Sequence, residues 1–380
     1  MTPWLLVSGD FTGRGGMDRA NLALAAHLAG QPDVELHLVT HQVDTDTFGP
    51  DPVRCHHVPR PGGWHVAGAP LLARAGRKCA RRLTRRGGRV IVNGGNCLWS
   101  DVSWVHYVHA AYEPETHTQS IRRVKDRLVR GRILARERET LRTVRLAICN
   151  SRRTQRDLVD RLRVPVSRTR VIYYGIDAER FGYVDRETAA AAREALGWPS
   201  DRPNVLFIGA LGDRRKGFDT LFETWVTLCR EPSWDGHLVV VGTGGELTSW
   251  QRRTQEAGLG GRATFLGFRT DIARIIAASD VAVHPARYEA YGLGAHEVLC
   301  RGLPVVVTST AGVAERYPPA LVDLLLQDPD SPAELASRLR AWREMQDRIH
   351  AEVRTFSDEL RRRSWGDMAA DIVDAVRGRG

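Results

Sequence analysis

The sequence predicts an α/β protein in which two domains with parallel sheets follow one another along the chain. Short β-branched runs alternate with helical patterns through most of the 380 residues, which is typical of parallel strands joined by helices. The length suits two domains of ordinary size, and a hydrophobic content of 42% allows each of them to bury a core.

The β-branched runs mark the expected strands. In the first half they are Pro3–Ser8, Val34–Thr40, Arg89–Asn93, Val102–Val108, Arg145–Cys149 and Thr169–Tyr174. In the second half they are Asn204–Ile208, His237–Val241, Ala263–Leu266, Val281–His284 and Pro304–Thr308. A polar, proline-containing stretch between Ile176 and Arg202 separates the two sets, so we expect domains over 1–180 and 190–360. Apolar residues at helical spacing predict a packed helix over 364–380.

The formal net charge of +10 raises nucleic acid, anionic membrane and phosphorylated substrates as partners. The densest basic stretches, Arg74–Arg89 and Arg122–Arg138, are typical of helices. Two interpretations of them stay open, a solvated face and peripheral docking on anionic lipid. Neither an aromatic-interleaved basic strand nor a base-reading helix is present in the sequence, so nucleic acid is not expected.

The six cysteines are widely scattered and form no C-x-x-C pair. The sequence therefore predicts neither a disulfide framework nor a metal site, and no His/Asp cluster is visible that would hold a metal. No apolar run reaches the roughly 20 residues of a membrane helix, and Met1–Asp10 lacks the charged start and cleavage site of a signal peptide. We therefore expect a cytoplasmic protein, with peripheral contact at the inner face of the membrane as the open alternative.

The strongest cluster of chemically functional residues lies in HPARYEAYGLGAHEVLCRGLPVVVTS, residues 284–309. A buried strand delivers Glu289 to a sheet edge, a glycine-rich turn follows, and a helix then carries Glu297. The turn is formed by Gly292, Leu293 and Gly294, whose backbone N–H groups at a helix start favour an anion such as a diphosphate. Glu297 can accept hydrogen bonds from vicinal hydroxyls such as those of a ribose. The simpler alternative is a helix start whose acidic residues favour the dipole.

A second, basic cluster lies in FIGALGDRRKGFDTLFETW, residues 207–225. After the expected strand, Arg214, Arg215 and Lys216 directly precede Gly217 and a helical pattern. Fixed cations neutralise the charge that develops on a diphosphate leaving group, and Lys216 is the first choice for this role. A solvated surface cluster is the alternative, although cations gain nothing from the dipole at a helix start.

These two stretches resemble the retaining glycosyltransferases of the GT-B fold, in the group usually called family 4. Glu289 and Glu297 are separated by seven residues, as in that family's paired-glutamate motif, and Gly209, Lys216 and Gly217 match its G…K-G segment. Further similar segments occur in the family's order. They are VVVGTGGEL at 239–247, FLGFRTDIARIIAASDVAVHP at 265–285 and TSTAGVAERYP at 308–318.

The first half is similar to the family over fewer residues, as expected of a domain that meets variable acceptors. Residues 8–29 resemble the family's opening strand, glycine-rich loop and first helix, with Gly15 and Gly16 at the double glycine. The spacing is not that of a dinucleotide fingerprint. The segments 150–158 and 173–177 also match the family's landmarks, and 364–373 looks like its helix that returns to the first domain.

The resemblance implies how a nucleotide sugar would be held. Phe268 and Arg269 would lie near the base, Glu297 on the ribose, and Lys216 with the glycine turn around the phosphates. Glu289 would orient the sugar hydroxyls. A histidine at the end of an N-terminal strand would contact the donor sugar, and His109 is favoured over His106, although a structural histidine is the alternative for both.

One position departs from the family's pattern. Many relatives have an arginine directly after the glycine equivalent to Gly209, whereas this chain has Ala210. Arg214 or Arg215 would have to supply the missing cation, and the donor preference is left open by this difference.

The expected activity is transfer of a sugar from a UDP- or GDP-linked donor to a glycan, glycolipid or small metabolite, with no cofactor and no metal. The nucleotide sugar would be a co-substrate. Two alternatives stay open: an epimerase or phosphorylase of the same architecture, and a non-catalytic basic binding protein. An epimerase would act on the donor without an acceptor.

Overall fold

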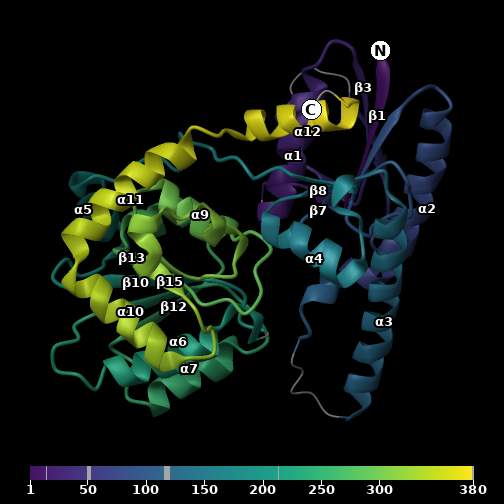
Figure 1. Cartoon of the computed structure of the whole chain (residues 1–380). Coiled ribbons are helices and arrows are strands. Elements are labelled where there is room, and N and C mark those ends of the chain that lie inside the picture. The colour runs from purple at the N-terminus through teal and green to yellow at the C-terminus, as the bar shows by residue number, and fades with distance from the viewer. Residues whose placement is uncertain (14, 49–52, 115–119, 213, 379–380) are drawn as a thin grey trace. The chain divides into compact units, whose positions relative to one another are not determined.

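The computed structural model describes residues 1–380 apart from 14, 49–52, 115–119, 213 and 379–380 (Figure 1). The chain forms two compact units. The first contains Met1–Glu113, His117–Gly175 and Ser364–Gly380, and the second is built on Ile176–Arg363. The final segment therefore belongs to the first unit, although it follows the second along the chain.

The first unit contains, within its described residues, a seven-stranded sheet in the order β5-β3-β1-β6-β7-β8-β9. Every neighbouring pair is parallel. Its strands are β1 (Thr2–Val7), β3 (Val34–Thr40), β5 (Val53–His57), β6 (Arg89–Asn93), β7 (Val102–Val105), β8 (Leu146–Cys149) and β9 (Thr169–Val171). Two short strands, β2 (Asp10–Phe11) and β4 (Gln42–Val43), pair separately. The sequence did not predict β5, because VRCHH has no apolar run.

Helices connect the strands of the first unit. They are α1 (Gly16–Ala29), α2 (His65–Thr84), α3 (Ser120–Thr143), α4 (Arg152–Leu162) and α12 (Trp365–Arg377). Helix α2 packs on β1, β3 and β6, whereas α12 packs against α1. Leu72, Cys79 and Leu83 of α2 join Leu5, Val39 and Val90 of the sheet in one buried cluster.

The second unit has a six-stranded parallel sheet in the order β12-β11-β10-β13-β14-β15. Its strands are β10 (Asn204–Ile208), β11 (His237–Val241), β12 (Ala263–Gly267), β13 (Val281–His284), β14 (Val305–Thr308) and β15 (Leu325–Leu326). Among the strands of this sheet in the described residues, the two-residue β15 alone had not been predicted, since it is too short to show a pattern.

The helices of the second unit flank this sheet (Figure 1). They are α5 (Arg186–Leu196), α6 (Phe218–Leu228), α7 (Leu247–Glu256), α8 (Ile272–Ala277), α9 (Leu293–Cys300), α10 (Pro332–Glu344) and α11 (Gln346–Arg361). The buried core joins β10, β11, β13 and β14 to the inner faces of α6, α9, α10 and α11, and residues of β12 pack against it partly buried. None of the helices in the described part of the chain is long and apolar enough to cross a membrane.

Candidate functional site

Glu289 lies in the loop that joins β13 to α9, at the carboxyl edge of the second unit's sheet. The four residues of β13 are all buried, so the strand is fixed in the core and its end positions this loop. The Glu289 carboxylate forms an ion pair with Lys216 Nζ and a hydrogen bond with His284 Nε2 at 3.0 Å. Its side chain is 14% exposed. Two donors therefore hold one carboxylate oxygen, Oε2, in a mostly buried position.

The charge state of this group follows from its neighbours. Burial alone would raise the pKa of the Glu289 carboxyl, but the Lys216 ammonium and the hydrogen bond from His284 together lower that pKa well below its ordinary value. Burial lowers the pKa of His284, so the ring is neutral near pH 7 and donates from Nε2. The site at neutral pH thus holds a carboxylate, an ammonium and a neutral imidazole.

Gly217 explains how Lys216 reaches Glu289. The residue has a φ of 70°, and a Cβ added to it would lie 1.9 Å from the carbonyl oxygen of Pro285. Only glycine permits this approach of the turn before α6 to the end of β13. The K-G pair therefore brings the ammonium of one loop to the carboxylate of the next.

The glycine turn before α9 leaves open space at Gly294. Gly292 has a φ of 104° and is the N-cap residue of α9, where no side chain caps the first turn. Beside Gly294 a Cβ would meet nothing within 4 Å, whereas Leu293 is 9% exposed. The first-turn N–H groups and the helix dipole favour an anion at this point. Glu297 lies one turn further on and is 4% exposed.

The Arg214 side chain pairs with Asp219, the second residue of α6. Its Nε donates to Asp219 Oδ2 at 2.6 Å, and Arg287 donates to both oxygens of the same carboxylate at 2.8 and 2.9 Å. Arg287 also reaches Asp330 Oδ1 at 2.6 Å. Burial would raise the pKa of Asp219, but hydrogen bonds from the two arginines outweigh it and hold the pKa below its ordinary value. This network fixes the base of the loop that carries Lys216. The expected contact of Arg214 with a diphosphate stays a prediction.

Arg215 lies between Arg214 and Lys216 in a short 3-10 turn, and its carbonyl accepts from the Arg287 N–H at 2.9 Å. Its charge acts on His284, whose pKa it helps to lower. Ala210, which replaces the family's arginine, is exposed. Arg215 is thus a candidate for the missing cation whose charge acts on the Glu289 cluster.

Two glycine loops meet beside Ala210. A Cβ on Gly242 would lie 1.8 Å from Gly209 O, and one on Gly244 would lie 2.2 Å from the backbone of Leu211. The loops after β10 and β11 therefore pack backbone against backbone, which only glycine allows.

Phe268 and Arg269 directly follow β12. Gly267 ends that strand with a φ of 65°, and the Phe268 ring is 64% exposed. Arg269 forms a two-pronged pair with Asp271, at 2.8 and 2.7 Å. An exposed aromatic ring held by a tight turn is suited to stacking on a planar base.

His109 begins a 3-10 turn, His109–Ala111, in the first unit, and its side chain is 49% exposed. Its Nδ1 donates to Glu137 Oε1 at 3.0 Å, so Nε2 holds the lone pair when the ring is neutral. The buried Glu137 carboxylate also accepts from the backbone N–H groups of His109 and Ala110, at 2.8 and 3.0 Å. Glu137, which the sequence did not suggest, thereby fixes the orientation of the ring.

His106, by contrast, is a core residue. It is 7% exposed, its Nδ1 bonds with the Tyr174 hydroxyl, and burial lowers its pKa to about 3. Asn150 donates to both the His106 carbonyl and the Tyr174 hydroxyl at 3.1 Å. Such a buried network is a structural arrangement.

Gly15 and Gly16 lie at the start of α1 in the first unit, with Gly15 as the N-cap residue. Asp18, in the first turn, packs so closely that a Cβ on Gly15 would lie 2.7 Å from its Oδ2. Burial, together with the nearby Asp10 charge, raises the pKa of Asp18 to about 6. The double glycine therefore leaves room for a partly buried carboxyl in this loop.

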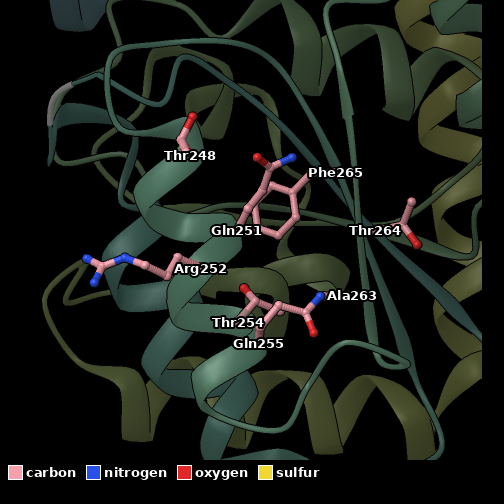
Figure 2. A pocket seen from close by; sticks show the side chains of 8 residues that line it. All are labelled: Thr248, Gln251, Arg252, Thr254, Gln255, Ala263, Thr264 and Phe265. Atoms are coloured by element: carbon pink, nitrogen blue, oxygen red, sulfur yellow. The ribbon is translucent and has the colours of Figure 1, made fainter.

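The second unit also contains a groove away from the candidate residues. It lies between α7 and the edge strand β12 and has a volume of about 500 Å³ (Figure 2). Its lining is Thr248, Gln251, Arg252, Thr254, Gln255, Ala263, Thr264 and Phe265. None of the predicted site residues is among them, so the groove is not the candidate site.

Comparison with known proteins identifies the family. Residues 14–180 match the family model described as glycosyltransferase family 4, and residues 202–344 match the one described as glycosyl transferases group 1. The two models together span most of both units. The chain is 34% identical over 152 residues to the lipopolysaccharide core biosynthesis mannosyltransferase LpsB of Rhizobium meliloti (strain 1021). That match covers 38% of this chain and 42% of LpsB, so it spans less than half of that relative.

Solved structures of the same architecture match this chain over nearly its whole length. WaaG, a glycosyltransferase involved in lipopolysaccharide biosynthesis, superposes with a TM-score of 0.75 at 18% identity, over 99% of this chain and all of WaaG. HepE from Anabaena, in complex with UDP and glucose, gives a TM-score of 0.72 at 19% identity over the whole of both chains. The fold is therefore GT-B, as predicted. The chain belongs to the glycosyltransferases of the GT-B fold, a family of enzymes that transfer sugars.

Proposed function

We propose that the protein transfers a sugar from a UDP- or GDP-linked donor to a hydroxyl of a glycan, glycolipid or small metabolite, with retention of the anomeric configuration. The observation that carries the proposal is the Glu289 carboxylate, held by Lys216 and His284 beside the first turn of α9. Two similar proteins support it, since LpsB is a mannosyltransferase and HepE was crystallised with UDP and glucose.

In this proposal the diphosphate of the donor accepts hydrogen bonds from the N–H groups at the start of α9, and Lys216 neutralises its charge. Arg215 adds a second cation in place of the arginine missing at Ala210. Glu297 accepts from the ribose hydroxyls, and the Phe268 ring, 64% exposed, stacks on the base. No cofactor takes part.

For the reaction itself we propose a front-face displacement. The bond between the anomeric carbon and the diphosphate oxygen breaks while the acceptor hydroxyl bonds to the same face, and its proton passes to the departing phosphate oxygen. Glu289 orients the sugar hydroxyls, and His109 is the further candidate for contact with the sugar. Fixed cations and amides stabilise the leaving group, so the proposal assigns no metal to this step.

The test is turnover in Glu289→Ala and Lys216→Ala. Each change removes one member of the charged pair, and we expect kcat/KM to fall by well over tenfold, because interactions with developing charge are typically worth about 3 kcal/mol. Arg252→Ala on the exposed face of α7 is the matched control and leaves turnover unchanged. Near-normal rates in both site variants would refute the assignment.

An incubation with donor and no acceptor separates the proposal from its nearest alternatives. A transferase leaves the donor intact apart from slow hydrolysis. An epimerase converts the donor to its stereoisomer without any acceptor, and a phosphorylase consumes it when inorganic phosphate is added. A non-catalytic binding protein leaves the donor unchanged whether it is incubated alone, with inorganic phosphate or with candidate acceptors.

For location we propose peripheral contact with an anionic membrane through one face of α2, called the α2 stripe. The stripe consists of Trp64, Leu71, Arg74, Lys78, Arg81 and Arg85, which are all exposed and recur at intervals of three, four or seven residues. Trp64 and Leu71 are large apolar side chains at 69% and 38% exposure. Apolar side chains at one end of a helix and cations along the rest complement the acyl boundary and the phosphate groups of a bilayer.

Sedimentation with vesicles tests this proposal. Vesicles that contain anionic phosphatidylglycerol should bind the protein, and neutral vesicles should not. Charge reversal of Arg74, Lys78 and Arg81 to Glu should weaken binding at least a hundredfold, at about 1 kcal/mol per cation. The same reversal at Arg186, Arg252 and Arg348, which are exposed in the second unit, should have little effect. Equal losses in the two triple variants would show that only net charge matters.

A further inference from the structure

Three metal-ligating side chains meet in the first unit, outside the residues used above. His37 of β3, His56 of β5 and Cys79 of α2 offer ligand atoms that all lie within 4.8 Å of one another. His37 Nδ1 and His56 Nε2 are 3.0 Å apart. His37 is 0% and Cys79 7% exposed, whereas His56 is half-buried. The cluster is thus closed on the core side and accessible from the side of His56.

The strand register brings these residues together. His37 pairs with Arg54 and Val39 with His56, so the two histidines are diagonal neighbours on the same face of the sheet. Helix α2 covers this face, and Cys79 packs there against Val39. Residues 37, 56 and 79 form no sequence motif, which is why the sequence predicted no metal site.

A carboxylate orients the central ligand. His37 Nε2 donates to Glu35 Oε1 at 3.2 Å, so the proton of the neutral ring lies on Nε2 and the lone pair of Nδ1 faces His56 and Cys79. Metal-binding histidines usually donate their second N–H to a carboxylate in this way. Neutral imidazole is the form of histidine that coordinates metal.

The spacing is close to that of a tetrahedral centre. Bonds of about 2.05 Å to nitrogen and 2.3 Å to sulfur separate two nitrogens by about 3.3 Å and a nitrogen from sulfur by about 3.6 Å. The observed 3.0 Å between nitrogens is near the first value. The two rings are nearly coplanar, at 5°, and share an N–H···N hydrogen bond, so a metal enters only if one ring turns. His56 is the ring that can turn, because β5 is the edge strand.

We propose that His37, His56 and Cys79 form a binding site for a zinc-class divalent ion, with water in the fourth position. On binding, the His56 proton moves to Nδ1 through solvent, the Cys79 thiol loses its proton to solvent, and the thiolate bonds to the metal. A thiol is ordinarily protonated at neutral pH and only the thiolate binds the metal, so one proton is released per ion bound. The bound ion ties the edge strand β5 to β3 and to α2.

Cobalt provides the direct probe, since thiolate-bound Co²⁺ has a charge-transfer absorption band in the near ultraviolet. Titration of metal-free protein with Co²⁺ should produce this band with a stoichiometry of about one and the visible bands of a tetrahedral centre. Zn²⁺ should then abolish the spectrum. An unbuffered titration should release about one proton per ion. Absence of the thiolate band in the wild-type chain overturns the proposal, independently of any variant.

Two variants and a matched control locate the site. Cys79→Ser keeps the side chain's shape and should abolish the thiolate band, and His56→Gln should weaken Co²⁺ binding at least tenfold. Cys55→Ser is the control, because Cys55 lies on β5 next to His56 but pairs with Leu38 on the opposite face. Circular dichroism checks that each variant is folded. Loss of the band in Cys55→Ser, or its retention in folded Cys79→Ser, would place the metal elsewhere and refute the site.

Discussion

At the scale of single residues, the Glu289 cluster shows how a buried carboxylate stays charged. Burial opposes ionisation, and a lone buried charge would be costly, so Lys216 and His284 are both needed to offset the lost hydration. Lys216 supplies the charge, whereas His284, 3.0 Å from Oε2, supplies a neutral donor at a fixed angle. His284 is therefore the residue that orients the carboxylate.

Replacement of His284 tests this role. His284→Phe removes the donor but keeps a ring, and we expect kcat to fall about tenfold to a hundredfold, since a hydrogen bond to a charged group contributes about 1.5–3 kcal/mol. His284→Gln retains a donor and should lose less. The measurement is steady-state kcat and KM for both variants. A His284→Phe enzyme with a kcat within about twofold of the wild type would show that Lys216 alone holds Glu289.

The pH profile gives an independent check of the same residue. Burial lowers the pKa of His284, so its ring takes up a proton only below the ordinary histidine pKa, and it remains a neutral donor above that value. If protonation of His284 lowers the rate, this loss of rate therefore occurs below the ordinary histidine pKa. It should disappear from the pH profile of His284→Phe. A limb at or above that pKa, lost in the variant, would contradict the neutral assignment.

The sequence predicted Glu289, Lys216 and Gly217 because their spacing in the chain is itself a pattern. It gave no sign of His284, which ends a buried strand, or of the bond between Arg214 and Asp219, since both depend on how loops meet in space. Arg214 and Asp219 are five residues apart in the sequence, but their contact also depends on Arg287, which donates to the same carboxylate from the loop after β13. The roles of these residues towards a donor stay predictions.

At the scale of elements, α12 follows the second unit in the sequence but belongs to the first unit. Ser364 and Asp367 form a reciprocal capping box at its start, which stops α11 from continuing into it. The buried face of α12 is Met368, Ala369, Ile372, Val373 and Val376, and it packs against α1 of the first unit. Helix α11, which directly precedes it, buries Ile349, Val353 and Phe356 in the core of the second unit.

Truncation of one side chain in α12 and one in α11 should distinguish the unfolding transitions of the two units. Ile372→Ala in α12 and Val353→Ala in α11 each leave a cavity, which costs about 2–5 kcal/mol for the isoleucine and somewhat less for the valine. We expect the first change to lower the unfolding temperature of the first unit and the second change that of the second unit. Calorimetry measures both. If the two variants lower the same transition, α12 and α11 belong to one cooperative core.

The elements that the sequence predicted correctly are those with an apolar run or helical period of their own. The strand β5 escaped because Val53–His57 carries Arg54, His56 and His57, which are polar residues that a buried parallel strand rarely contains. Its polar character reflects the His37–His56 pair and the edge position, and both features exist only once β3 and α2 have packed. A strand such as β5, whose polar side chains interact with neighbouring elements, is thus missed when strands are predicted from apolar runs.

At the scale of the whole molecule, the two units have separate sheets and separate cores, and the residues proposed for the nucleotide lie in one of them. Glu289, Glu297, Lys216, Phe268 and the start of α9 all belong to the second unit. A nucleotide bound there stabilises the folded second unit by RT ln(1 + [L]/Kd) and adds nothing directly to the first. Multidomain chains often unfold in more than one step, so this difference is measurable.

We therefore expect UDP or GDP to raise one of two calorimetric transitions. At a hundredfold excess over Kd the gain is about 2.7 kcal/mol, which corresponds to roughly 5–10 °C for a unit of this size. The transition that shifts should be the one lowered by Val353→Ala, and the one lowered by Ile372→Ala should stay within about 1 °C. Lys216→Ala should suppress the shift, whereas Arg252→Ala should preserve it. A nucleotide that shifts only the transition sensitive to Ile372→Ala would place its binding site in the first unit and overturn the proposed donor site.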